Sequence, residues 1–186
     1  MITERPPVKF TYEDYLLIPG DGKRHEIIDG EEYVAPAPNT RHQRLVGRLF
    51  FYLTAYLQNA DQGEVFVAPI DVILSDIDVV QPDVLFVAKE HTDRIGEHGI
   101  TGAPDLIVEV LSEGNRRHDE VRKRKLYERS GVAEYWIVDP ELETVKVYRM
   151  TDRGYVRAAE RSREAGDAVV SPMLTGFTLA LDALFA

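Results

Sequence analysis

Two acidic residues stand in segments that are otherwise mostly apolar. Asp83 lies within Val79–Val87, and Glu109 lies within Asp105–Leu111. An ionised carboxylate buried without a partner costs several kcal/mol, so each acid needs a compensating cation. If the two segments form neighbouring strands, both carboxylates can converge on one divalent metal, and hard oxygen ligands select Mg²⁺ or Mn²⁺. The alternative is that each acid lies at a strand end and meets solvent or an arginine.

A helix predicted over Arg117–Ser130 supplies a basic residue for the same site. At 100° per residue, Lys123 lies on one arc of this helix with Leu126 and Tyr127, the large apolar residues at its C-terminal end. That arc is expected to face the sheet, so Lys123 points inward. Asp119 precedes it by one turn and can orient the ammonium or accept its charge. Otherwise Lys123 extends out of the packed face to solvent, or it only pairs with Asp119.

The segments around these residues predict a parallel strand–helix–strand unit. Asp105–Leu111 is apolar on both faces apart from its acids, which is typical of a central strand. The helix ends at Gly131, a favourable C-terminal stop, and Glu134–Val138 is predicted to be a second buried strand. Two strands joined by one helix and short links are expected to be parallel, with a right-handed crossover.

The remaining segments predict a single α/β domain over residues 1–186 with a mixed sheet. A helix is predicted from Thr40 to about Asn59, because leucine recurs there at every fourth residue. Asp29-Gly30 is a dipeptide favoured in tight hairpins, and the polar stretch Lys89–Gly102 is predicted to be a loop. The other expected elements are a helix over Thr11–Leu17, strands over His25–Ile28, Glu32–Val34, Val65–Leu74 and Val79–Val87, a hairpin of Val145–Met150 with Tyr155–Ala159, and a packed apolar tail over Phe177–Phe185.

Composition limits the classes of protein that the chain can represent. It has 186 residues, a net charge of −10 and no cysteine. The absence of cysteine excludes disulfides, thiolate zinc sites and cysteine nucleophiles. No apolar run approaches the roughly 20 residues of a membrane-spanning helix, and Met1–Pro6 lacks the pattern of a signal peptide. We therefore expect a cytoplasmic protein with no membrane association.

The acidic net charge argues against nonspecific coating of nucleic acid, which depends on clustered Lys and Arg. Two local basic clusters nevertheless occur. One contains Arg41, Arg44 and Arg48 at helical spacing; the other contains Arg116-Arg117 followed by Arg122–Lys125. We expect Arg41, Arg44, Arg116 and Arg117 to contact nucleic acid. The alternative for each cluster is a solvated helix face on an acidic protein.

Five short motifs follow one another along the chain. They are His25–Gly30, Gln81–Val84, Pro104–Ser112, Lys123–Tyr127 and Gly131–Asp139. In this order they resemble a large bacterial family of restriction endonucleases, of the domain of unknown function 820 type, within the PD-(D/E)XK nuclease superfamily. Each motif alone is weak, but the ordered set, from about residue 10 to 150, is specific. The resemblance implies a restriction-endonuclease-like α/β core with flanking helices.

The resemblance also implies roles for individual residues. Asp83 is similar to the superfamily's first metal-binding aspartate and Glu109 to the acid on the next core strand, with the backbone carbonyl of Val110 completing the metal shell. The superfamily lysine usually stands two positions after that acid, where this chain has Leu111. The family match assigns the lysine to Lys123 on the following helix instead, in agreement with the helical wheel.

Two further residues and the overall activity follow from the same resemblance. Glu26 matches an acid of the family's first hairpin and is expected to bind metal or water, the alternative being a structural salt bridge. His42 either contacts a phosphate or caps its helix. The implied activity is Mg²⁺- or Mn²⁺-dependent endonucleolytic hydrolysis of phosphodiester bonds, with DNA as the expected substrate and a homodimer as the expected assembly. Two alternatives stay open: an inactive nucleic-acid-binding or interaction module of the same fold, and a hydrolase of a non-nucleic-acid phosphate ester.

Overall fold

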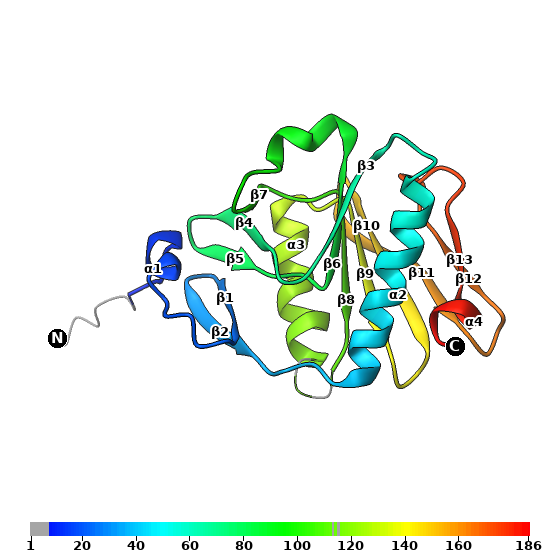
Figure 1. Ribbon diagram of the computed structural model, residues 1–186, viewed down its shortest axis with the longest axis horizontal. Coiled ribbons are helices and arrows are strands. Elements are labelled where there is room, and N and C mark those ends of the chain that lie inside the picture. The colour runs from blue at the N-terminus through cyan, green and yellow to red at the C-terminus, as the bar shows by residue number, and fades with distance from the viewer. Residues whose placement is uncertain (1–7, 113, 115) are drawn as a thin grey trace.

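A six-stranded mixed sheet lies at the centre of the computed structural model, which describes residues 8–112, 114 and 116–186 (Figure 1). Its strand order is β11-β10-β9-β8-β6-β3. Strands β8 and β9 are parallel, and the other neighbouring pairs of this sheet are antiparallel. The segment Met1–Pro6, in which no signal peptide is expected, lies outside the described residues.

The bounds of the elements, in chain order, are as follows. They are α1 (Tyr12–Leu16), β1 (Arg24–Ile28), β2 (Glu31–Ala35), α2 (Thr40–Leu57), β3 (Gly63–Val67), β4 (Asp71–Ser75), β5 (Asp78–Val80), β6 (Val84–Ala88), η1 (Lys89–Arg94), β7 (Gly99–Thr101), β8 (Leu106–Val110), η2 (His118–Lys123), α3 (Arg124–Ser130), β9 (Glu134–Asp139), β10 (Thr144–Thr151), β11 (Gly154–Ser162), β12 (Ala168–Val170), β13 (Thr178–Ala180) and α4 (Leu181–Leu184).

The predicted parallel strand–helix–strand unit is confirmed. Strand β8 pairs in parallel with β9, and Glu109 stands opposite Ile137. The helix between them ends at Gly131, whose φ of 82° is the left-handed conformation that glycine adopts readily. Its first part, η2, is a π-helix, which the uniform 100° wheel did not predict. Such wide turns occur mostly as short insertions and frequently at functional sites, and this one carries Asp119 and Lys123.

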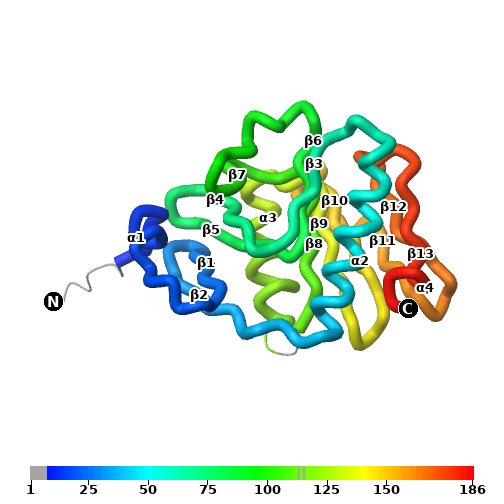
Figure 2. The backbone as a smooth tube through the Cα atoms, in the orientation of Figure 1, coloured from blue at the N-terminus to red at the C-terminus, as the bar shows by residue number. Residues whose placement is uncertain are grey.

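Both faces of the central sheet are buried, because α2 and α3 lie on opposite sides of it (Figure 2). Side chains alternate between the two faces of a strand. On β8, Val108 and Val110 belong to the apolar cluster with α2, and Ile107 belongs to the cluster with α3, as does Leu111 just beyond the strand. Glu109 therefore lies on the α3 side of the sheet, together with Ile107 and Leu111.

A five-stranded sheet of order β2-β1-β5-β4-β7 packs beside this core. The two long strands predicted over Val65–Leu74 and Val79–Val87 are wrong as continuous strands. Each is divided, into β3 and β4 and into β5 and β6, and the halves belong to different sheets. Proline lacks the N–H that a strand ladder requires, and Pro69 and Pro82 stand at the two breaks. As a result, Asp83 lies in the bend directly before β6 rather than inside a strand.

The turn and cap signals of the N-terminal third are confirmed. Asp29 and Gly30 have φ values of 56° and 74°, as a two-residue hairpin between β1 and β2 requires. Thr11 caps α1 through a capping box. Helix α2 is capped by Asn39, whose side chain accepts a hydrogen bond from the backbone N–H of His42 (2.9 Å). His42 is therefore not the residue that caps the helix.

The prediction of a loop over Lys89–Gly102 is wrong in part, because η1 and β7 lie within it and β7 pairs in parallel with β4. The apolar tail packs as predicted, since Phe177 and Phe185 belong to the core cluster that contains α2. In the described part of the chain, no helix is both long enough and apolar enough to cross a membrane.

Candidate active site

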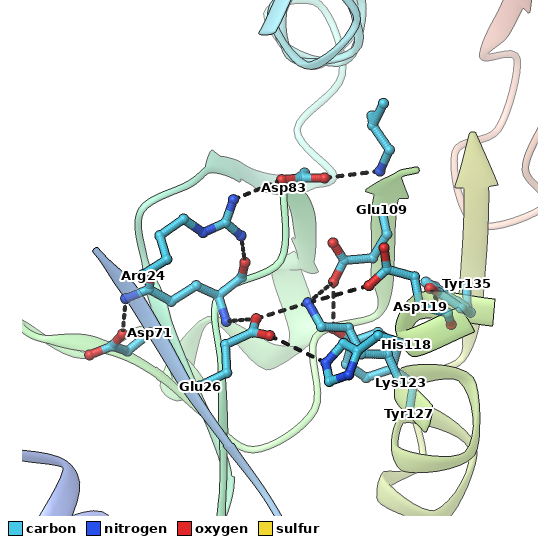
Figure 3. Close-up of polar contacts among 12 residues, drawn as sticks. Arg24, Glu26, Asp71, Asp83, Glu109, His118, Asp119, Lys123, Tyr127 and Tyr135 are labelled. Carbon is cyan, nitrogen blue, oxygen red and sulfur yellow. Dashed lines mark hydrogen bonds and ion pairs between the residues drawn. The ribbon is translucent and has the colours of Figure 1, made fainter. Parts of the chain in front are cut away.

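The ammonium of Lys123 is buried between carboxylates that come from two sheets. Its side chain is 4% exposed, and Nζ donates to Glu26 Oε1 (2.8 Å) and to Glu109 Oε1 (2.9 Å), as Figure 3 shows. Asp119 Oδ1 lies 3.9 Å from the same nitrogen. Burial lowers the pKa of Lys123, but the three acids outweigh it and raise the pKa above its usual value. Lys123 is thus a permanent cation on the inward face of the helix, as the wheel predicts.

Glu26 is held at the middle of β1 by three groups. Its Oε1 accepts from Lys123 and from the backbone N–H of Gln81 (2.9 Å), and His118 Nε2 lies 3.7 Å from its Oε2. Burial raises the pKa of Glu26, but Lys123 and His118 outweigh it and bring the pKa to about 2. Glu26 is therefore an anion across the physiological range, and it makes the structural salt bridge that was one of its two expected roles.

One carboxylate oxygen of Glu109 accepts two hydrogen bonds. Its Oε1 accepts from Lys123 and from the hydroxyl of Tyr127 (2.7 Å). Burial raises the pKa of Glu109, the charges of Asp83 and Glu26 add to this, and Lys123 opposes it without cancelling it. Among the residues that the structure describes, no hydrogen bond is made to Glu109 Oε2, so this oxygen keeps its full capacity to bind a ligand.

Asp83 is held from three directions. Arg24 Nη1 donates to Oδ1 (3.1 Å), while His42 Nε2 (3.1 Å) and the backbone N–H of Val110 (2.9 Å) donate to Oδ2. Burial raises the pKa of Asp83, but His42, Arg24 and the Val110 N–H lower it below its usual value. The bond to Val110 ties Asp83 to the residue that follows Glu109 on β8, so the two acids are neighbours.

Asp119 is a buried acid with few partners that could stabilise its negative charge. It is 2% exposed, and its Oδ1 has no hydrogen-bond partner within the described ranges. Burial raises the pKa of Asp119 well above its usual value, and the lowering effect of Lys123 at 3.9 Å does not offset this. Burial thus favours the neutral form of Asp119, and a further cation beside it would favour the ionised form.

These groups surround one small polar cavity with a volume of about 20 Å³. Its wall includes Arg24, His42, Asp83, Glu109, Asp119 and Lys123. A site needs about 10–15 Å³ to hold a single water molecule, so the cavity accepts an ion, a water or one phosphate oxygen. Asp83, Glu109 and Lys123, three residues predicted from the sequence, share this cavity, and Glu26 is connected to it through Lys123.

Comparison with known proteins gives the family. A family model named Uma2 and described as "Putative restriction endonuclease" matches residues 12–182. The chain belongs to the Uma2 family. A crystal structure of a nuclease described as putative and as belonging to DUF820, from Anabaena variabilis ATCC 29413, is similar at a TM-score of 0.79 and 20% sequence identity, covering 96% of this chain and 98% of that chain. No curated protein matches the sequence.

The fold and the resemblance expected from the sequence are thereby confirmed. The mixed sheets and flanking helices match those of the DUF820 nuclease over nearly the whole of both chains, and the Uma2 description agrees with the five ordered motifs. The family description supports nuclease activity in general terms.

The acidic cavity of this Uma2 protein offers a divalent metal few protein ligands, but they are of a suitable kind. No group of three or more His, Cys, Asp or Glu side chains arranged to hold a metal ion occurs in the described part of the chain. Two hard oxygen donors, Asp83 and Glu109, do line the same cavity. One oxygen of Glu109 is open, and Asp119 Oδ1 is buried without a partner. Water, a backbone carbonyl or substrate would have to supply the remaining ligands, as is usual for Mg²⁺.

The balance of charges around the cavity also favours a bound divalent cation. Four buried carboxyl groups face Lys123, Arg24 and His42; they belong to Glu26, Asp83, Glu109 and Asp119. Burial lowers the pKa of His42, but Asp83 outweighs it and raises the pKa. Even with His42 charged, the four carboxyl groups outnumber the three cationic groups. A divalent cation would favour the ionised forms of Asp119 and Glu109, whose pKa values are both raised, so these residues fit such an ion.

Arg116, one of the residues expected to bind nucleic acid, is engaged within the protein. Its guanidinium donates to both oxygens of Asp139 (2.5 and 3.1 Å) and to Glu141 (3.2 Å). Asp139 is buried, and Arg116 keeps about a third of its side chain exposed. The pair is bidentate, which orients Arg116 firmly at the surface beside β9.

The other three basic residues lie at the surface. Arg41 makes a long ion pair with Glu143 (3.6 Å) and keeps half of its side chain exposed. Arg44 and Arg117 are exposed. A cavity of about 130 Å³ between Arg41 and Arg116 shares Ser112 with the acidic cavity.

Four residues of the site were missed as site residues from the sequence: Arg24, His42 as a partner of Asp83, His118 beside Glu26, and the hydroxyl of Tyr127. A signal existed for two of them. Arg24 stands two positions before Glu26 and so shares its face of β1. His42 continues the helical row of buried leucines on α2, so it had to point into the core. Tyr127 was identified as apolar packing, and nothing in the pattern indicated where its hydroxyl would find a partner.

Proposed function

We propose that this protein is a divalent-metal-dependent endonuclease that hydrolyses phosphodiester bonds in nucleic acid, with DNA as its substrate. One observation carries the proposal. Lys123 is buried at 2.8 and 2.9 Å from Glu26 and Glu109, on the wall of a cavity that it shares with Asp83. A buried cation oriented by two acids beside further acids is costly to build, and such a preorganised cation can stabilise the negative charge that develops during phosphodiester hydrolysis.

Asp83 and Glu109 would hold Mg²⁺ or Mn²⁺, with the backbone carbonyl of Val110 as a third protein ligand. A metal bound there supplies a Lewis acid that polarises the phosphate and lowers the pKa of a bound water. Arg24 and His42 keep Asp83 ionised and fix its orientation. The hydroxyl of Tyr127 fixes Glu109 Oε1, which leaves Oε2 to face the ion.

Lys123 would act on the substrate directly. Its ammonium is held by Glu26 and Glu109 at a set position before substrate arrives, so little reorganisation is needed when negative charge grows on the phosphate oxygens. The role of Glu26 is then to position Lys123. Arg41, Arg44, Arg116 and Arg117 would contact phosphates on either side of the cleaved bond.

A second candidate is a nucleic-acid-binding module of the same fold that has lost catalysis. This candidate is favoured by the hydrogen bonds that Asp83 already accepts from Arg24, His42 and the Val110 N–H, because they occupy both carboxylate oxygens without a metal. A third candidate, a hydrolase of small phosphate esters, is favoured by the net charge of −10, which opposes tight binding of a polyanion.

One experiment separates the three candidates. Purified protein is incubated with supercoiled plasmid, single-stranded DNA and bis(4-nitrophenyl) phosphate, each with Mg²⁺, Mn²⁺ or EDTA. The proposed nuclease nicks or cuts DNA only with metal, and Asp83→Asn removes this activity. Hydrolysis of the small ester alone would support the third candidate, and DNA binding without any hydrolysis would support the second.

Assembly and location complete the proposal. A two-fold symmetric homodimer would let each copy act on one strand of a duplex that is locally opened or of a junction. Analytical ultracentrifugation with and without a DNA duplex tests this. A chain without cysteine needs no oxidising compartment, in keeping with a cytoplasmic enzyme.

A further inference from the structure

A second cavity lies next to the acidic one. It has a volume of about 300 Å³ and is lined by Lys23, Arg24, Pro36, Pro38, Gln43 and Pro69, together with Ala35, which precedes Pro36, and Ala37, which lies between Pro36 and Pro38. We call it the proline groove. The two cavities share four lining residues, Arg24, Ala35, Pro36 and Pro38, so a ligand larger than the acidic cavity can extend along this wall into the groove. Figure 3 shows Arg24, one of these shared residues, reaching toward Asp83.

The volumes of the two cavities suit different parts of a nucleotide. The acidic cavity, at about 20 Å³, accepts an ion, a water or a phosphate oxygen but no ring. The proline groove, at about 300 Å³, is at the lower end of the range of small-molecule sites, about 300–1,000 Å³. A phosphodiester bound at the acids therefore has room for its neighbouring sugar and base in the proline groove.

The walls of the proline groove have the chemistry that a base needs. Pro36, Pro38 and Pro69 present apolar ring faces whose backbone is fixed, so the surface exists before the ligand binds. Gln43, on the first turn of α2, carries an amide that both donates and accepts, as the edge of a base requires. Lys23 is exposed at the rim, where the next phosphate of a strand would pass.

We propose that the proline groove binds one unpaired nucleobase next to the phosphate that is cleaved. This deepens the nuclease proposed above and rests on it. A base enters such a groove only when it has left its stack and its partner, so the favoured substrates are single strands, junctions or locally opened duplexes rather than intact duplex. Phosphate contacts position the nucleic-acid strand, and the groove selects strands in which the base beside the cleaved phosphate is unpaired and unstacked.

Binding is tested without cleavage by fluorescence anisotropy of labelled (dT)₂₀ in EDTA. Ala37→Trp fills the groove from an exposed position and is expected to weaken binding about tenfold, the size of losing one stacked base. Gln43→Ala is expected to weaken it less. Ala165→Trp, in an exposed turn outside the groove, and Gln58→Ala, at the other end of α2, are the matched controls and are expected to bind as wild type does. Circular dichroism confirms that each variant is folded.

Cleavage is tested with Mg²⁺ on oligonucleotides in which a tetrahydrofuran abasic residue replaces one nucleotide at each position in turn. Cleavage is expected to fall about tenfold at the phosphate beside the missing base and to be normal elsewhere. If wild type cleaves but neither Ala37→Trp nor the abasic scan has any effect, the groove assignment is overturned and the nuclease stands. If Ala37→Trp blocks binding but wild type cleaves nothing, the groove stands and the nuclease fails. If wild type neither binds nor cleaves, both fail.

Discussion

Replacing Lys123 by alanine is expected to stop cleavage and also to weaken the fold at neutral pH. The helical wheel alone suggests an intact fold, but the structure shows that Lys123 separates two buried acids, Glu26 and Glu109. Removing one partner of a buried ion pair leaves the other charge uncompensated and costs about 3–5 kcal/mol. The pKa of Glu26 gives a second figure. A shift from 4.5 to about 2 corresponds to about 3 kcal/mol of folding free energy.

The same pKa gives the sign of the pH dependence. The folded pKa of Glu26 lies below its unfolded value, so its stabilising effect is present above about pH 4.5 and is lost as the pH falls toward 2. Burial raises this pKa, and Lys123 is the largest of the groups that lower it. The deficit of Lys123→Ala relative to wild type is therefore expected to be largest near pH 7 and clearly smaller at pH 4.

Urea unfolding at pH 7 and pH 4, with plasmid cleavage in Mg²⁺, measures both effects. Cleavage is expected to fall by a factor on the order of 10² or more, as when one preorganised donor to a developing charge is lost. Lys125→Ala is the matched control, because Lys125 is exposed and points away from the sheet. It is expected to keep its stability and lose only a little substrate affinity. A Lys123→Ala protein with wild-type stability at both pH values, or an inactive Lys125→Ala protein, would refute the reasoning.

Three further predictions concern the metal acids and two buried partners. Asp83→Asn and Glu109→Gln are each expected to abolish Mg²⁺ or Mn²⁺ binding in isothermal titration, and unchanged binding in both variants would eliminate the metal site. Tyr127→Phe removes a buried hydroxyl that donates to a carboxylate and is expected to cost about 1.5–3 kcal/mol in denaturant unfolding; a variant as stable as wild type would contradict this. Arg116→Ala is expected to cost about 1–3 kcal/mol at pH 7, since Asp139 keeps only backbone donors. Burial raises the pKa of Asp139, but Arg116 and those donors lower it below 3.8. The stability difference from wild type should therefore shrink as the pH falls below 3.8, and a difference that stays constant throughout acid titration argues against this role.

The parts of the fold that could be predicted are those specified by local pattern. The β8–helix–β9 unit followed from two apolar runs, a helical stretch and a terminal glycine, all close in sequence. The hairpin at Asp29-Gly30 followed from turn chemistry. The inward direction of Lys123 followed from its spacing to Leu126 and Tyr127, and this direction survives the π-turn because the residues concerned stay on one side of the helix.

The parts that could not be predicted depend on contacts between distant segments. Val79–Val87 has the composition of one strand, and its halves pair in different sheets because Pro82 interrupts the ladder. The compensation of Asp83 involves Arg24 and His42, which are 59 and 41 residues away in the sequence. Periodicity reports which face of an element is buried, but not which side chain of another element it meets there.

In the site proposed above, the lysine comes from a helix and not from the strand position of the superfamily motif. In the superfamily that the chain resembles, the lysine stands two residues after the strand acid, on the same face, and here that position is Leu111. Leu111 is 2% exposed and packs in the apolar cluster against α3. The helix that covers this face brings Lys123 to 2.9 Å from Glu109. An ammonium from the covering helix thus reaches the same acid that a strand lysine would reach, and the strand position is free to strengthen the core. What the chemistry constrains is the location of the charge relative to the acid, and two neighbouring elements can each deliver it.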